Sequence, residues 1–162
     1  MSSLFRVGFG TDTHRLIDGL PFFLGGIKIE HHKGAQGHSD ADALIHAICD
    51  ALLGAANLRD IGFHFPDNNP EYKGIDSKKL LANVINLIEN HFYKIGNIDC
   101  TIQLQKPKLM PHIPEMKKTL ALILKIGEED ISIKAKTGEG LGYIGNEEGI
   151  DVQVIALIYK TN

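Results

Sequence analysis

Apolar and polar positions along the chain follow two periods, one typical of helices and one typical of strands. Helical spacing recurs in three stretches, at residues 37–56, 77–96 and 114–127. Alternating or continuous apolar runs predict strands at 5–9, 98–104, 131–135 and 152–159, and a hairpin over 22–29. The run at 152–159 is apolar on both faces, so we expect it to be a central strand. Residues 57–70 carry the turn formers of a loop, and a loop of this length in a compact chain is usually functional.

The stretch from residue 37 to residue 56 holds the clearest candidate chemistry. Ser39 can cap a helix, with Asp42 at the acidic position of a capping box, and Gly54 can end the helix. The apolar face of this helix consists of Leu44, Ile48, Ala51, Leu52 and Ala55. On roughly the opposite side, Asp42, His46 and Asp50 stand four residues apart and line up. This row is either a functional face or a solvated surface that contains a histidine by chance.

An aspartate and a histidine, two positions apart, follow the first predicted strand. Side chains two apart in extended chain point the same way, so Asp12 and His14 can face one point. One carboxylate and two imidazoles, with His46 as the third group, make a zinc site with an open fourth position. Because Asp-x-His also occurs by chance in many chains, the spacing alone leaves a metal site and an ordinary strand end both open.

Composition narrows the class of protein. The chain has 162 residues, 43% of them hydrophobic and 23% charged, as expected for a single globular domain over residues 1–162. A net charge of −3 with dispersed basic residues argues against a nucleic-acid partner. No apolar run approaches the roughly 18 residues of a membrane span, and the N-terminus does not resemble a signal peptide. Cys49 and Cys100 are expected to be buried reduced thiols of a cytoplasmic protein, and His31 and His32 to lie at the surface.

Five motifs in one order along the whole chain resemble a single enzyme family. They are the Asp12-x-His14 pair, HSDADALIHAICDALLGAA from His38, DIGFHFPD from Asp60, PKLMPHI from Pro107, and KAKTGEGLGYIG from Lys134 followed by EEGI from Glu147. The chain thereby resembles the 2-C-methyl-D-erythritol 2,4-cyclodiphosphate synthases, lyases of the non-mevalonate isoprenoid pathway. The expected fold is α/β (α+β), a single catalytic domain with a mixed four-stranded sheet covered by helices on one face. The resemblance implies a homotrimer with active sites between subunits.

The resemblance also implies the reaction. The substrate is 4-diphosphocytidyl-2-C-methyl-D-erythritol 2-phosphate, whose 2-phosphate attacks the β-phosphorus, expels CMP and closes the cyclic diphosphate. A phosphate monoester has a second pKa near ~6 and is already largely anionic at neutral pH, so the attack needs no strong general base. The obstacle is repulsion between anions, which metal ions and positioned hydrogen-bond donors reduce.

The metal sites follow from the same resemblance. Asp12, His14 and His46 bind one zinc ion, or another divalent transition metal, per subunit. Glu139 holds a Mg²⁺ or Mn²⁺ ion that bridges the two phosphates of the substrate diphosphate. Asp50 is expected to orient one of the zinc ligands.

The resemblance gives two residues catalytic roles, because His38 and Thr137 stabilise the charge that develops in the transition state. The implied substrate-binding residues are Asp12, His14, His38, Ser39, Asp60, Ile61, Gly62, Phe65, Pro66, Asp67, Asn68, Asn69, Leu104, Lys108, Leu109, Met110, Lys136, Thr137, Gly138, Glu139 and Tyr143. The chain departs from many relatives at four positions, Thr11, Lys136, Tyr143 and Asn146.

Two other functions fit part of the same pattern. A zinc-dependent nucleotide pyrophosphatase could use the same ligands, with water in place of the internal phosphate as the attacking group. A non-catalytic trimeric module that binds a metal or a nucleotide would use the ligands but would give Glu139 and Thr137 no purpose.

Overall fold

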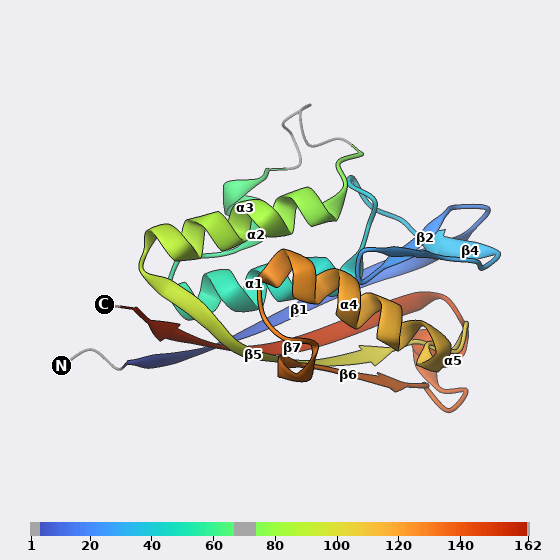
Figure 1. Ribbon diagram of the computed structural model, residues 1–162. Helices are drawn as coiled ribbons and strands as arrows, with labels where there is room; N and C mark the ends of the chain where they lie inside the picture. The colour runs from blue at the N-terminus through green and yellow to red at the C-terminus, as the bar shows by residue number, and fades with distance from the viewer. Residues whose placement is uncertain (1–3, 67–73, 162) are drawn as a thin grey trace.

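The structure is a computed structural model that describes residues 4–66 and 74–161. Helices cover one face of a mixed sheet, as predicted (Figure 1). The helices are α1 (Ala43–Ala56), α2 (Ile61–His64), α3 (Ser77–Asn90), α4 (Ile113–Leu124) and α5 (Gly142–Gly145). The strands are β1 (Phe5–Asp18), β2 (Phe22–Leu24), β3 (Ile27–Ile29), β4 (Lys33–Ala35), β5 (Tyr93–Gln103), β6 (Ile131–Lys136) and β7 (Gly149–Lys160).

The main sheet has five strands in the order β4-β1-β7-β5-β6, one more than the four that we expected. The additional strand, β4, is three residues long and pairs with the end of β1, and it is too short to show an alternating pattern. All neighbours are antiparallel except β5 and β6, which run parallel. The prediction that β7 is central is confirmed. So is the hairpin over 22–29, in which Gly25 and Gly26 make the turn with positive φ.

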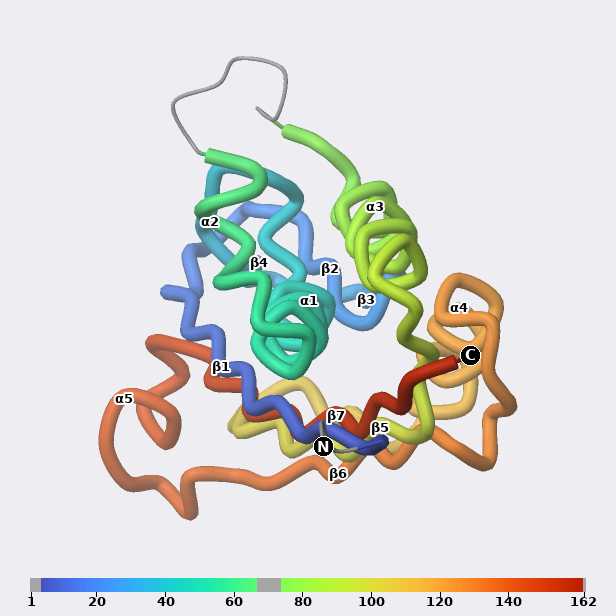
Figure 2. Tube along the Cα trace, turned by 90° about the vertical axis from the view of Figure 1, so that its left-hand side faces the viewer, coloured from blue at the N-terminus to red at the C-terminus, as the bar shows by residue number. Residues whose placement is uncertain are grey.

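Helix α1 lies directly against the backbone of β1, because two glycines remove the side chains that would separate them. A Cβ atom at Gly8 would lie 1.9 Å from the Ala51 carbonyl oxygen, and one at Gly10 would lie 2.0 Å from that of Ala47. On its other side α1 is covered by α3, so it sits in the middle of the molecule (Figure 2). Of the two interpretations of the Asp42, His46 and Asp50 row, the solvated surface is therefore wrong, since α1 is buried almost all the way round.

The ends of α1 also differ from the prediction. The N-cap is Asp42, whose side chain accepts a hydrogen bond from the Ile45 backbone N–H, and not Ser39. The helix continues past Gly54 to Ala56 and ends at Asn57, which adopts the left-handed conformation typical of a C-terminal cap. Three residues separate Ser39 from the helix, which leaves its hydroxyl outside the first turn.

The face of the sheet turned away from α1 carries exposed apolar side chains. Phe5, Val7 and Phe9 on β1 are 59%, 66% and 61% exposed, and Ile155 on β7, paired with Phe9, is 49% exposed. Four large apolar side chains on neighbouring strands form a patch of the kind that marks a protein–protein interface. Cys49 and Cys100 are buried free thiols, as expected. Among the described residues no helix is long and apolar enough to cross a membrane.

Candidate active site

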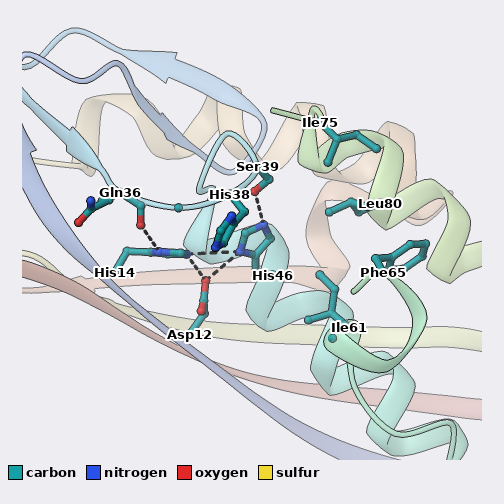
Figure 3. Close-up of a pocket in the computed structure, with 12 residues that line it drawn as sticks. Asp12, His14, Gln36, His38, Ser39, His46, Ile61, Phe65, Ile75 and Leu80 are labelled. Atoms are coloured by element: carbon teal, nitrogen blue, oxygen red, sulfur yellow. Dashed lines mark hydrogen bonds and ion pairs between the residues drawn. The ribbon is translucent and has the colours of Figure 1, made fainter. Parts of the chain in front are cut away.

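Strand β1 and the first turn of α1 bring three predicted ligands together. The residues of β1 that face α1 continue from the two glycines to Asp12 and His14, which end beside His46 (Figure 3). Asp12 Oδ2 lies 2.8 Å from His14 Nε2 and 3.0 Å from His46 Nδ1, and the two nitrogens lie 3.4 Å apart. Glycines that let the helix approach the strand therefore also set the distance between these groups, which we call the triad.

The spacing of the triad fits one tetrahedral metal ion. Zinc bonds of about 2.0–2.1 Å place neighbouring ligands of a tetrahedron ~3.3 Å apart, close to the three distances observed. His14 Nδ1 lies 2.8 Å from the Gln36 backbone carbonyl, which accepts its proton and leaves the lone pair of Nε2 directed at the triad. A carboxylate with two neutral imidazoles is a donor set that suits zinc and similar transition metals.

The charges of the triad are coupled. Burial raises the pKa of Asp12, but the contacts of its carboxylate with His14 and His46 outweigh burial and lower that pKa to about 2. Burial lowers the pKa of His14, yet Asp12, which accepts a hydrogen bond from the protonated ring and attracts its charge, raises the pKa of His14 overall. Asp12 is therefore ionised at any pH at which the protein functions, and it stabilises positive charge beside it.

A cavity of about 560 Å³ opens above the triad. One end is polar, with His38 and Ser39 beside the triad (Figure 3). The other end is lined by apolar side chains from α2, α3 and the segments beside them: Ile61, Phe65, Ile75 and Leu80. The cavity thus offers charged and apolar walls to one ligand of mixed polarity.

The other two carboxylates of α1 hold backbone segments and do not touch the triad. Asp42 is 0% exposed, and its oxygens accept N–H groups of Gly25 and Gly26 at 2.9 and 2.6 Å. This confirms a capping role and excludes a surface position. Asp50 accepts the Ile61 backbone N–H at 2.7 Å, so it holds α2. The expectation that Asp50 orients a zinc ligand is wrong.

A second group of predicted site residues lies elsewhere, at the C-terminal ends of the parallel strands β5 and β6. The Leu104 N–H donates to the Lys136 carbonyl at 2.9 Å, and the Gly138 N–H donates to Gln105 Oε1 at 3.1 Å. Thr137 and Glu139 also belong to this group, and Thr137 Oγ1 donates to Glu139 Oε1 at 2.5 Å. We call residues 104–110 and 136–139 the second group, and it supplies none of the described residues that line the triad cavity.

The remaining predicted substrate residues divide in the same way. Seven line the triad cavity, namely Asp12, His14, His38, Ser39, Ile61, Gly62 and Phe65. Outside it are Pro66 and Asp60, which caps α2, together with Lys108, Leu109, Met110 and Tyr143. Asp67, Asn68 and Asn69 lie outside the described residues. Sequence reasoning missed Gln36, whose contribution is a backbone carbonyl and therefore has no signal in the residue type.

A further set of possible ligands does not form a second metal site. His31, His32 and Glu147 bring ligand atoms within 4.8 Å of one another. The Glu147 carboxylate, however, pairs with Lys106 Nζ at 2.8 Å, and Lys33 Nζ donates to the Glu147 carbonyl at 2.8 Å. The Lys106 ammonium neutralises this carboxylate, and the Lys33 ammonium adds a second positive charge nearby that repels a cation. His32 is exposed as expected, whereas His31 is partly buried.

Comparisons with known proteins agree on one family. The model of the YgbB family matches residues 5–159. The chain is 58% identical over 158 residues to the 2-C-methyl-D-erythritol 2,4-cyclodiphosphate synthase of Porphyromonas gingivalis, covering 98% of each chain. It matches the solved bifunctional IspDF of Campylobacter jejuni with a TM-score of 0.93 and 34% identity, over 98% of this chain and 43% of that one. It matches IspF of Plasmodium falciparum in complex with CDP with a TM-score of 0.86 and 34% identity, over 99% and 100% of the two chains.

Proposed function

The chain belongs to the YgbB family and is an enzyme that forms a cyclic diphosphate for isoprenoid precursors, and we propose how its residues divide the work. The reaction converts 4-diphosphocytidyl-2-C-methyl-D-erythritol 2-phosphate into 2-C-methyl-D-erythritol 2,4-cyclodiphosphate and CMP. An oxygen of the 2-phosphate bonds to the β-phosphorus, and the bond from that phosphorus to the oxygen of CMP breaks. The observation that carries the proposal is the triad at the polar end of the cavity. Residues 1–162 act as one catalytic domain.

Asp12, His14 and His46 hold a divalent metal, for which zinc fits best. When bound, the metal withdraws negative charge from the β-phosphate and so lowers the repulsion between the two phosphates. His38 and Ser39, beside the triad, donate hydrogen bonds to phosphate oxygens as charge builds up on them. The cavity orients attacking and leaving groups in line, which is most of what such a reaction requires of a protein.

The apolar end of the cavity receives the methylerythritol part of the substrate. Ile61, Gly62 and Phe65 line this end and form a wall that suits a carbon chain with a methyl branch. We assign the remaining contacts to methylerythritol and ribose to Asp60 and Pro66, and to Asp67, Asn68 and Asn69, which lie outside the described residues.

The second group binds the cytidine diphosphate part. Leu104 and Leu109 are only 4% and 3% exposed, so they contact the ligand through their backbones, and the exposed Lys108 and Met110 face it with side chains. Glu139 holds a Mg²⁺ or Mn²⁺ ion with the diphosphate, and its neighbours Lys136, Gly138 and Tyr143 contact the substrate. Thr137 donates its hydroxyl proton to the developing charge.

A homotrimer joins the two halves of the site. The second group of a chain does not line the triad cavity of that chain, so a neighbouring copy supplies it. The exposed apolar face of the sheet, with Phe5, Val7, Phe9 and Ile155, supports a contact between copies. We also propose a cytoplasmic location, which the two buried free thiols support, and no nucleic-acid or membrane partner.

Product analysis tests this function against its alternatives. The metal-loaded protein is incubated with the substrate, and the phosphorus-containing products are identified by nuclear magnetic resonance. The cyclic diphosphate with CMP supports the proposal. A ring-opened bisphosphate with CMP would indicate a pyrophosphatase, and no product in a single turnover would indicate a module that only binds.

A further inference from the structure

The two imidazoles of the triad differ in what contacts their outer nitrogens. His14 Nδ1 faces the Gln36 carbonyl, which can only accept, so the protonated nitrogen of His14 is fixed. His46 Nε2 faces two hydroxyl groups, Ser77 Oγ at 2.9 Å and Ser39 Oγ at 3.1 Å. Because a hydroxyl both donates and accepts, these two contacts by themselves allow either tautomer of His46.

Asp40 removes this ambiguity. Its Oδ1 accepts the hydroxyl proton of Ser77, and its Oδ2 accepts the Ser77 backbone N–H at 3.0 Å. Ser77 is 0% exposed, so water does not compete for these bonds. An ionised carboxylate can only accept hydrogen bonds, so Ser77 donates its single hydroxyl proton to Asp40. The Ser77 oxygen turns its lone pairs toward His46, whose Nε2 must carry a proton.

We propose that Asp40 and Ser77 are positioning residues that hold neutral His46 with its proton on Nε2 and its Nδ1 free to bind the metal. The inference rests on the metal site proposed above and adds two residues to it. Without the carboxylate, the Ser77 hydroxyl can donate to Nε2, which favours the tautomer whose Nδ1–H cannot bind a cation. Partners of metal-binding histidines change metal affinity by about 10–100-fold when they are mutated.

The same chain gives Ser39 a different role. Its oxygen accepts the Ala41 backbone N–H at 3.1 Å and shares the proton of His46 Nε2. Both contacts use lone pairs of the oxygen, which leaves the hydroxyl proton of Ser39 to be donated into the cavity that this residue lines. Ser39 thus serves the substrate phosphate, while Ser77, which contacts the same nitrogen, serves the metal.

Zinc affinity, measured by competition with a chelator, separates the two serines. Ser77→Ala removes the hydroxyl but keeps the backbone N–H that Asp40 binds, and Asp40→Asn keeps the shape of that side chain. Each should raise the Kd for zinc by about 10–100-fold. Ser39→Ala is the matched control, because it removes the other hydroxyl group that contacts His46 Nε2. It should change the Kd for zinc by a much smaller factor. Thermal unfolding of each variant checks that it folds. If Ser77→Ala does not fold, Asp40→Asn still tests the proposal.

The proton on Nε2 is observed through the nitrogen chemical shifts of His46 in zinc-loaded protein, because without the metal the ionised Asp12 carboxylate, 3.0 Å from Nδ1, itself accepts a hydrogen bond from that nitrogen. In the wild type the Nε2 proton should exchange slowly with water, and Asp40→Asn should make this exchange faster, which a merely structural role would not do. If wild-type protein binds zinc and both variants bind it equally well with the same exchange of the Nε2 proton, the positioning role is overturned and the proposed function stands. If His46→Ala binds zinc as tightly as the wild type, the metal site is wrong and the inference fails with it.

Discussion

Mixing two inactive variants tests whether each active site is shared between subunits. His46→Ala removes a ligand of the triad, and Glu139→Gln removes the negative charge of the second group while keeping its shape. Among the described residues, none of the second group lines the triad cavity of its own chain. Each variant should therefore inactivate a different half of the site, and the two halves of one site should come from different subunits.

The activity that the mixture should recover follows from the geometry of a cyclic trimer. In such a trimer every site joins the triad of one subunit to the second group of the next. After dissociation, mixing in equal amounts and reassembly, a site is intact only when a Glu139→Gln subunit supplies the triad and a His46→Ala subunit supplies the second group. Random reassembly makes about one quarter of the sites intact. Losing a charge-stabilising group worth about 3 kcal/mol leaves ~1% of the rate, so the mixture should exceed Glu139→Gln alone by roughly 25-fold.

The assay is the initial rate of CMP release, with each variant taken through the same dissociation and reassembly by itself as a control. A mixture whose rate equals the average of the two separate variants would refute the reasoning, because both halves of the site would then come from one chain.

Three further predictions concern the second metal, the contact between helix and strand, and pH. A higher Mg²⁺ concentration should recover part of the rate lost in Glu139→Gln but none of the rate lost in Thr137→Val, because a cation does not replace a hydroxyl donor. Equal rescue of both variants would place the second metal elsewhere. Gly10→Ala puts a methyl group 2.0 Å from a carbonyl oxygen of α1, so it should lower the free energy of unfolding by about 1–3 kcal/mol and weaken zinc binding. Gly54→Ala is the control, because a methyl group there has nothing within 4 Å, and it should cause neither loss. Thermal unfolding measures the first effect and chelator competition the second, and equal results for the two variants would contradict the prediction. Zinc affinity should fall as pH is lowered, and the fall should begin at a higher pH than for an ordinary histidine, because the pKa of His14 is raised and a protonated imidazole cannot bind metal. Chelator competition from about pH 8 to pH 5 would contradict this prediction if the affinity stayed level.

The sequence predicts most of the elements because periodicity is a local property that burial imposes on each one. It predicts β7 as a central strand from a run that is apolar on both faces. It does not predict the start of α1, because Ser39 and Asp42 are both good capping residues and the choice depends on distant parts of the chain. The Asp42 carboxylate also accepts N–H groups of Gly25 and Gly26 in the hairpin, which favours it as the cap.

The candidate site shows the same division between local and distant information. Asp12 and His14 are two apart on one strand, and the family resemblance adds His46, so the triad can be predicted. Ser77 stands 37 positions from Asp40, and only the packing of α3 beside the turn before α1 brings them together. Serine at the start of a helical stretch is typical of an N-cap, but the cap of α3 is Asp76, which leaves the Ser77 hydroxyl for Asp40.

The metal content of the purified protein tests the central claim most directly. The claim is that Asp12, His14 and His46 together hold one divalent metal per chain. Elemental analysis of the wild type beside His46→Ala, prepared identically and shown to be folded, should find about one zinc or similar ion per chain in the wild type and almost none in the variant. Equal metal content in the two proteins would contradict the claim, because the ion would then be bound without the triad.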